Sequence, residues 1–166
     1  MREGAEVVVV DALFRRGSAL NLAWLESINS SAGFYFVQAD LADPEAVSTV
    51  FRRHAPFDFI CHVGGQVAMT TSLKDPVRDM RTNVVGTFNI LEAARSLSHN
   101  SLIAYSSTNK VYGDLEWLSY QEDVTRYSLP DYPNGLDELI PLDFSTPYGC
   151  SKGAADQYVR DWARVY

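Results

Sequence analysis

The chain has 166 residues, of which 46% are hydrophobic and 12% aromatic, a composition that excludes intrinsic disorder and suffices for one domain with a buried core. Its formal net charge of −7 argues against nucleic acid or an anionic membrane as the main partner, because phosphate binding requires a basic surface. Two cysteines are too few for a disulfide framework, and neither a signal peptide nor a membrane-length apolar run is visible, so we expect a soluble cytoplasmic protein with free thiols.

Short apolar runs alternate with helical patterns along the chain. The runs at 6–10, 34–39, 57–62 and 102–107 are continuously apolar and predict buried strands. Helices are predicted at 21–28, at 44–54 behind an Asp43 N-cap, and at 76–97. Strands that alternate with helices predict an α/β fold with a parallel sheet. The apolar stripe of the longest helix consists of Val77, Met80, Val84, Phe88, Leu91 and Ala94, and Gly86 within it indicates close packing.

One segment, 113–146, does not fit this alternation. It has few periodic features and several Pro, Asp and Gly residues, together with the aromatic residues Trp117, Tyr120, Tyr127 and Tyr132. Long loops in compact domains are usually functional or disordered, and the aromatic residues disfavour disorder. We therefore interpret 113–146 as an ordered insertion over a site, with a neutral surface excursion as the alternative.

Polar or flexible residues follow each predicted strand, at the edge where open α/β sheets bind ligands. Asp11 ends the first strand and suits an adenosine ribose, which favours NAD over NADP, although an acid there is also common as a helix cap. Asp40 and Leu41 follow the second strand. They are suited to bind an adenine ring, and they are equally suited to form an ordinary turn. The remaining strand ends carry the paired Gly64 and Gly65, and the hydroxyls of Ser106, Ser107 and Thr108.

Two further features bear on chemistry. His62 lacks partners for a metal site, so we predict a hydrogen-bonded core histidine and no metal.

Tyr148 and Lys152 lie four residues apart at the start of a predicted helix, so their side chains lie on the same face of that helix. An isolated pair of this kind is usually an ordinary surface pair. An ammonium group beside a phenol can also lower the phenol pKa and prepare it for proton transfer.

These features occur in order along one alternating pattern, and the motifs "HVGGQVAMTTS", "NVVGTFNILEAAR", "YSSTNKVYGD" and "PYGCSKGAADQY" resemble the extended short-chain dehydrogenase/reductase family of NAD-dependent nucleotide-sugar epimerases and dehydratases. The resemblance covers essentially the whole chain. It implies that residues 1–166 are a partial NAD-binding domain with a Rossmann-like, doubly wound parallel sheet.

The resemblance also implies roles for single residues. Tyr148 would be the catalytic acid/base, Lys152 would hold the nicotinamide ribose, and Thr108 would bind the substrate hydroxyl. The cofactor would be bound by Asp11, Asp40, Leu41, Val63, Gly64, Gly65, Gln66, Asn83, Ser106, Tyr148 and Lys152. The substrate would be bound by Gln66, Thr108 and Asn109.

The implied reaction is a redox-neutral epimerisation, in which a sugar hydroxyl is oxidised and the resulting ketone is reduced from its other face. Sugar 4,6-dehydratases, the alternative, place an Asp-Glu pair after the threonine, where this chain has Asn109 and Lys110. The segments "GSALNLAWL" and "STNKVYGDLE" look most like the CDP-paratose/CDP-tyvelose 2-epimerase type, which implies a nucleotide-sugar substrate, a CDP-linked 3,6-dideoxyhexose.

The chain departs from the family by lacking a G-x-x-G-x-x-G loop. We therefore expect the first strand with its Gly-rich loop, and a C-terminal substrate domain, to be absent from these 166 residues. The absent strand would lie in the middle of the sheet, so two open strand edges and an uncovered apolar face are expected. The resemblance implies a homo-oligomer in the full-length form, paired through the helices at 76–97 and from 148 onward. A non-catalytic, truncated Rossmann-like module that binds a partner is the competing interpretation.

Overall fold

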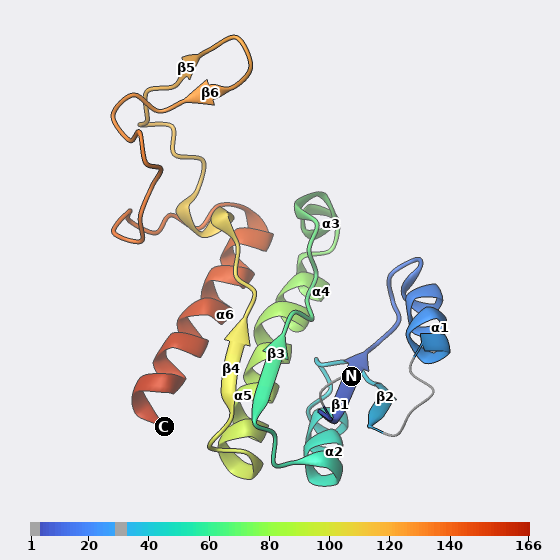
Figure 1. Ribbon diagram of the computed structural model, residues 1–166. Coiled ribbons are helices and arrows are strands. Elements are labelled where there is room, and N and C mark those ends of the chain that lie inside the picture. The colour runs from blue at the N-terminus through green and yellow to red at the C-terminus, as the bar shows by residue number, and fades with distance from the viewer. Residues whose placement is uncertain (1–3, 29–32) are drawn as a thin grey trace.

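The computed structural model describes residues 4–28 and 33–166 and has an α/β fold (Figure 1). The four predicted strands are all present, within three residues of their expected bounds. The strands are β1 (Val7–Asp11), β2 (Phe34–Gln38), β3 (Phe59–His62), β4 (Leu102–Tyr105), β5 (Gln121–Glu122) and β6 (Tyr127–Ser128). The α-helices are α1 (Ser18–Ile28), α2 (Pro44–His54), α3 (Met69–Lys74), α4 (Pro76–Met80), α5 (Gly86–Leu97) and α6 (Thr146–Val165), with a π turn, η1 (Arg81–Val85), and a 3-10 turn, η2 (Asn109–Tyr112).

The four long strands form two separate parallel pairs. β1 pairs with β2, and β3 pairs with β4. Among the described residues, no strand joins β1 to β3, so each pair has open edges (Figure 1). The parallel arrangement and the interrupted middle of the sheet are as predicted from the sequence.

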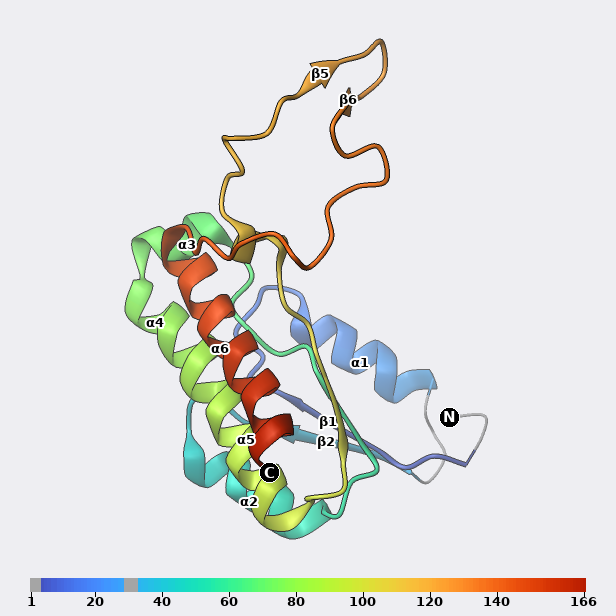
Figure 2. The same ribbon diagram turned by 90° about the vertical axis from the view of Figure 1, so that its left-hand side faces the viewer.

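The two faces of the β3–β4 pair differ in burial. Helices α2, α5 and α6 lie together on one side of the pair (Figure 2), and Ile60 and Ile103 pack there against the core. Phe59 and Leu102 point to the other face and are 52% and 67% exposed. The prediction that these strands are buried throughout was therefore wrong, because no described helix covers that face. The predicted uncovered apolar face is present.

The hydrophobic core lies between α2 and α5. Its buried residues come from both helices and are Val47, Phe51, Ile90, Ala93 and Ala94. Helix α2 begins as predicted, because the Asp43 carboxylate accepts hydrogen bonds from the backbone N–H groups of Glu45 and Ala46. Among the described residues, no helix is long and apolar enough to cross a membrane.

The helix predicted at 76–97 is continuous but changes geometry within its length. The π turn η1 inserts one extra residue between α4 and α5, and this rotates the buried face. Val77, Met80 and Phe88, which belong to the predicted apolar stripe, are exposed, so the prediction was wrong for these three residues. The buried face instead runs through the polar residues Asp79, Asn83 and Thr87 before it reaches the apolar core.

The segment between η2 and α6 projects away from the helices in both views (Figures 1 and 2). It contains the β5–β6 hairpin, and the rings of Trp117 and Tyr132 meet edge to face. Its two ends meet at a neck, where Asp143 N donates to Val111 O over 3.0 Å. The neck resembles the base of an Ω-loop. Its suggested place over an active site stays a prediction.

Gly113 lies at this neck, and we expect Gly113→Ala to lower the free energy of unfolding by about 2–4 kcal/mol. The residue has φ +71°, and an added Cβ would lie 2.7 Å from the backbone oxygen of Asp143. Gly135 provides the matched control, since it also has positive φ but has open space around its Cα. Gly135→Ala should lower the free energy of unfolding by only about 1–2 kcal/mol, the cost of the positive φ alone. Urea denaturation measures the free energy of unfolding of both variants. Equal decreases in the two would show that the neck is not closely packed.

Candidate active site

The predicted acidic residues at the first two strand ends form local turns. Asp11 is exposed, and its Oδ1 accepts a hydrogen bond from Leu13 N. Asp40 Oδ1 accepts one from Ala42 N over 2.9 Å. Each carboxylate keeps its second oxygen without a hydrogen-bond partner among the described residues, so both can still accept from a ligand.

Leu41 is in close contact with the chain around it. Asn89 Nδ2 donates to Leu41 O, and an added Cβ at Gly86 would lie 3.0 Å from Leu41 Cβ. The predicted close packing at Gly86 is thus confirmed. An added Cβ at Gly64 would lie 2.7 Å from Leu41 Cδ1. This glycine brings the loop after β3 against the loop after β2.

The loop after β3 is held by Asn83 of the π turn. Asn83 Oδ1 accepts from Gln66 N at 2.8 Å, and Asn83 Nδ2 donates to Gln66 O at 3.2 Å. Gly65 allows this approach, because an added Cβ there would lie 2.9 Å from Asn83 Oδ1. The Gln66 amide also bonds to the backbone of Ala68. The structure therefore brings Gln66 and Asn83 together, and their proposed contacts with cofactor or substrate stay predictions.

Helix α6 begins with Pro147 in its first turn, which suits a helix start. Two of its glycines let neighbouring segments approach. An added Cβ at Gly149 would lie 3.0 Å from Lys110 O, and one at Gly153 would lie 2.5 Å from the ring of Phe144. The helix carrying Tyr148 and Lys152 is thereby held against both ends of the projecting segment.

Lys152 is buried at the carboxyl end of β4. Its ammonium group donates to Ser106 O and lies 4.1 Å from the centroid of the Tyr105 ring. Burial lowers the pKa of Lys152, while the negative charges of Asp156 and Asp79 act in the opposite direction. A buried ammonium group with a shifted pKa at a strand end is a feature of functional sites.

Tyr148 and Thr108 lie near this lysine in the fold without bonding to it. Tyr148 is half-buried, and its backbone N–H donates to Ser72 Oγ. Thr108 Oγ1 accepts from Lys110 N at 3.3 Å and caps η2. Among the described residues, no hydrogen bond joins the hydroxyls of Tyr148 and Thr108 to each other or to Lys152. Their catalytic roles, and those of Ser106, Val63 and Asn109, stay predictions.

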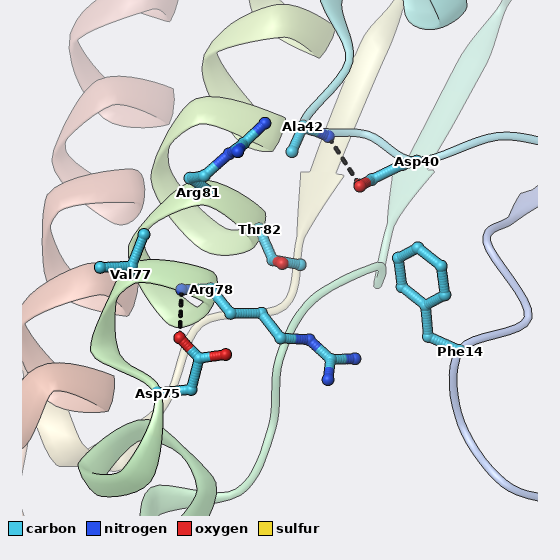
Figure 3. A pocket seen from close by; sticks show the side chains of 8 residues that line it. All are labelled: Phe14, Asp40, Ala42, Asp75, Val77, Arg78, Arg81 and Thr82. Atoms are coloured by element: carbon cyan, nitrogen blue, oxygen red, sulfur yellow. Dashed lines mark hydrogen bonds between the residues drawn. The ribbon is translucent and has the colours of Figure 1, made fainter.

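A cavity of about 540 Å³ opens beside the loop after β2. Figure 3 shows Phe14 on one side and the side chain of Arg78 reaching toward it from α4, with Asp40 nearby. The Arg78 guanidinium lies 5.5 Å from the Phe14 ring centroid. The complete lining is Phe14, Asp40, Ala42, Asp75, Val77, Arg78, Arg81 and Thr82. Asp40 is thus the one predicted cofactor residue that lines this cavity.

Sequence reasoning missed a buried polar cluster beside Lys152. Asp79 is fully buried and accepts hydrogen bonds from Ser151, Gln66 and Asn83. One signal for it exists in the sequence, because Asp79 precedes Asn83 by four residues and therefore shares its helix face.

Comparisons with known proteins show to which family the chain belongs. The model of the GDP-mannose 4,6 dehydratase family matches residues 1–166. The chain is 49% identical over its whole length to a CDP-paratose 2-epimerase of Salmonella typhi. It is also 34% identical, over 98% of its length, to a dTDP-glucose 4,6-dehydratase of Mycolicibacterium smegmatis. It spans 48% and 42% of these two relatives, less than half of each.

Two solved structures share the fold. The UDP-Glc/GlcNAc 4-epimerase of Campylobacter jejuni superimposes with a TM-score of 0.76 at 26% identity, over 98% of this chain and 43% of that one. DesIV, a dTDP-glucose 4,6-dehydratase from Streptomyces venezuelae, was solved with NAD bound. It also superimposes with a TM-score of 0.76, at 27% identity, over 97% of this chain and 43% of that one. These matches confirm an incomplete Rossmann-like sheet and the resemblance to epimerases and dehydratases. The chain therefore belongs to the GDP-mannose 4,6 dehydratase family.

Proposed function

We propose that this chain carries the proton-handling site of an NAD-dependent nucleotide-sugar epimerase. The observation that carries the proposal is the buried ammonium group of Lys152, which bonds to Ser106 O at the end of β4, one helical turn after Tyr148. A purely structural helix has no need for a desolvated lysine at a strand end. The 49% identity to a CDP-paratose 2-epimerase supports the same function.

The residues present would bind three parts of NAD. Asp40 lies on the wall of the cavity of about 540 Å³ and would accept from an adenine amino group. At the other end of the site, Lys152 would bind the hydroxyls of the nicotinamide ribose. Asp11 would bind the adenosine ribose, and the close-packed loop with Gly64 and Gly65 would lie along the cofactor between them.

Bound NAD⁺ supplies a hydride acceptor next to the sugar carbon. The Tyr148 phenolate would remove the proton of the sugar hydroxyl and return it after the ketone is reduced from its opposite face. Lys152, as a nearby cation, would favour the phenolate form. Because Thr108 Oγ1 accepts from Lys110 N, its own hydrogen is free to donate to the reacting sugar oxygen.

We infer that the substrate is a CDP-linked 3,6-dideoxyhexose, as expected for the CDP-paratose 2-epimerase type. Two residues disfavour the dehydratase alternative. Asn109 has no ionisable group, and the Lys110 ammonium pairs with Asp114 at 3.4 Å. Neither side chain supplies the carboxylic acid that must protonate a departing hydroxyl.

The outer surface of α5 and α6 supports the proposal that the full-length protein is a homo-oligomer. Aromatic rings from both helices meet edge to face there, with Phe88 contacting Tyr158 and Trp162. Phe88 and Tyr158 are 38% and 41% exposed. Exposed aromatic clusters of this kind are typical of interfaces between protein chains.

The proposal is tested by thermal unfolding of the chain with and without about 1 mM NAD⁺. A ligand at one hundred times its Kd stabilises the folded state by about 2.7 kcal/mol, so we expect a clearly raised midpoint. Lys152→Met should abolish this rise, because the neutral side chain cannot bind the ribose hydroxyls.

Lys74→Met is the matched control, since Lys74 is an exposed lysine on α3, and it should keep the full response to NAD⁺. A wild-type midpoint that ignores NAD⁺ contradicts the proposal and favours the non-catalytic module. If NAD⁺ raises the midpoint of the Lys152→Met variant as well, the role given to Lys152 is contradicted.

A further inference from the structure

Asp79 is a fully buried carboxylate without a direct ion pair among the described residues. Three side chains donate to it. They are Gln66, whose Nε2 lies 2.8 Å from Oδ1, Asn83, whose Nδ2 lies 3.4 Å from the same oxygen, and Ser151, whose hydroxyl bonds to Oδ2. A carboxylate that accepts only from neutral groups in a protein interior is costly to bury.

The three donors belong to three different parts of the fold. Gln66 lies in the loop after β3, Asn83 in the π turn, and Ser151 on α6 directly before Lys152. Asn83 Nδ2 also donates to Ser151 Oγ at 2.9 Å, so Asn83, Ser151 and Asp79 form one connected network. Asp79 therefore connects the loop expected to contact the cofactor with the helix that carries Tyr148 and Lys152.

The charge of Asp79 also acts on Lys152. Burial disfavours the ammonium form of this lysine, and the two carboxylates that counter the effect are Asp156 and Asp79. His62 on β3 lies close enough for the Lys152 charge to affect it, and the Tyr105 ring lies against the ammonium group. The titratable groups around Lys152 are thus His62, Tyr105, Tyr148, Asp156 and Asp79.

We propose that Asp79 is a positioning residue, which sets the place of α6 against the loop after β3 and adds a buried negative charge to the surroundings of Lys152. The proposal rests on the proposed function, because a charged Lys152 matters only if that group binds the cofactor and assists Tyr148. It also accounts for the three donors, because an apolar residue at this position would leave the Gln66, Asn83 and Ser151 groups without their acceptor.

The test is an NMR titration of lysine labelled with ¹³C at Cε. The chain has three lysines, Lys74, Lys110 and Lys152, so the spectrum is simple and the other two signals serve as references. We expect Lys152 to titrate below the usual value of about 10.4. Asp79→Asn should lower the Lys152 midpoint further, because it removes a nearby negative charge.

Ser151→Ala is the matched control. It removes a hydrogen bond to Asp79 but no charge, so the Lys152 midpoint should move by much less than in Asp79→Asn. Equal shifts in the two variants, or no shift in Asp79→Asn, overturn the proposal and leave Asp79 a structural hydrogen-bond acceptor. The titration needs neither NAD⁺ nor sugar, so this proposal and the proposed function can fail independently.

If the Asp79→Asn variant does not fold, the double variant Asp79→Asn/Lys152→Met distinguishes the effect of the charge from the effect of the hydrogen bonds. Removing both charges should restore folding if the unbalanced Lys152 ammonium group caused the loss. A double variant that also fails to fold shows that the hydrogen bonds of Asp79, and not its charge, are what the chain requires, and this result overturns the proposal.

Discussion

Replacing Phe51 with alanine is expected to lower the free energy of unfolding by about 3–5 kcal/mol. Phe51 is buried between α2 and α5, and its ring meets the Phe57 ring edge to face at 5.2 Å between centroids. The substitution removes this aromatic contact and leaves a cavity in the core. Because domains of this size have stabilities of only about 5–15 kcal/mol, the loss would be a large part of the total.

Phe59→Ala is the matched control, because it makes the same substitution on the uncovered face of the β3–β4 pair. Phe59 is 52% exposed, so its loss should cost less than about 1 kcal/mol. Urea denaturation followed by circular dichroism measures both variants. If Phe59→Ala proved as destabilising as Phe51→Ala, the open face of β3 and β4 would have to be covered in solution.

The sequence was sufficient to predict β1 to β4, their parallel pairing and the start of α2, because each depends on local patterns. It placed the start of α1 at residue 21, whereas the helix begins at Ser18, and it did not predict α3. Apolar runs define β1 to β4, and Asp43 with Pro44 defines the start of α2. The Tyr148–Lys152 pair was recognised from its spacing of four. Its spacing did not predict that Lys152 is buried at a strand end, which the structure shows.

Other features depend on contacts between distant segments and could not be read from local patterns. The π turn changes which residues of the long helix face inward, so Asp79 replaces Val77 and Met80 on the buried side. Gly64 and Gly65 were expected to approach a ligand, which stays a prediction. Their close approach to Leu41 and Asn83 was not visible in the sequence. The network of Asp79 and Ser151 joins residues 72 positions apart.

His62 should make the protein lose stability in mild acid. It is buried, as the sequence predicted, and its Nε2 lies 2.8 Å from Thr87 Oγ1. Because the Thr87 hydroxyl donates to Asn83 O, Nε2 must carry the hydrogen of a neutral imidazole. Burial, and secondarily the positive charge of Lys152, lowers the pKa of His62 to about 4.

An unfolded chain binds this proton near pH 6.5, so between pH 6.5 and 4 the unfolded state holds more protons than the folded state. The free energy of unfolding therefore falls as the pH is lowered through this window, by about 3 kcal/mol in total. In the folded state His62 takes up its proton only near pH 4, where an imidazolium would face the Lys152 charge, so NAD⁺ binding should weaken only as the pH approaches 4.

Urea denaturation between pH 7 and 4 tests this expectation with His62→Gln, whose side-chain amide can still donate to Thr87 but does not titrate. The variant should lose much less stability than the wild type over this range. His99→Gln, at an exposed histidine, should behave like the wild type. Parallel pH profiles for His62→Gln and the wild type would contradict the buried, neutral state of His62. The acid sensitivity would then have to come from groups other than His62.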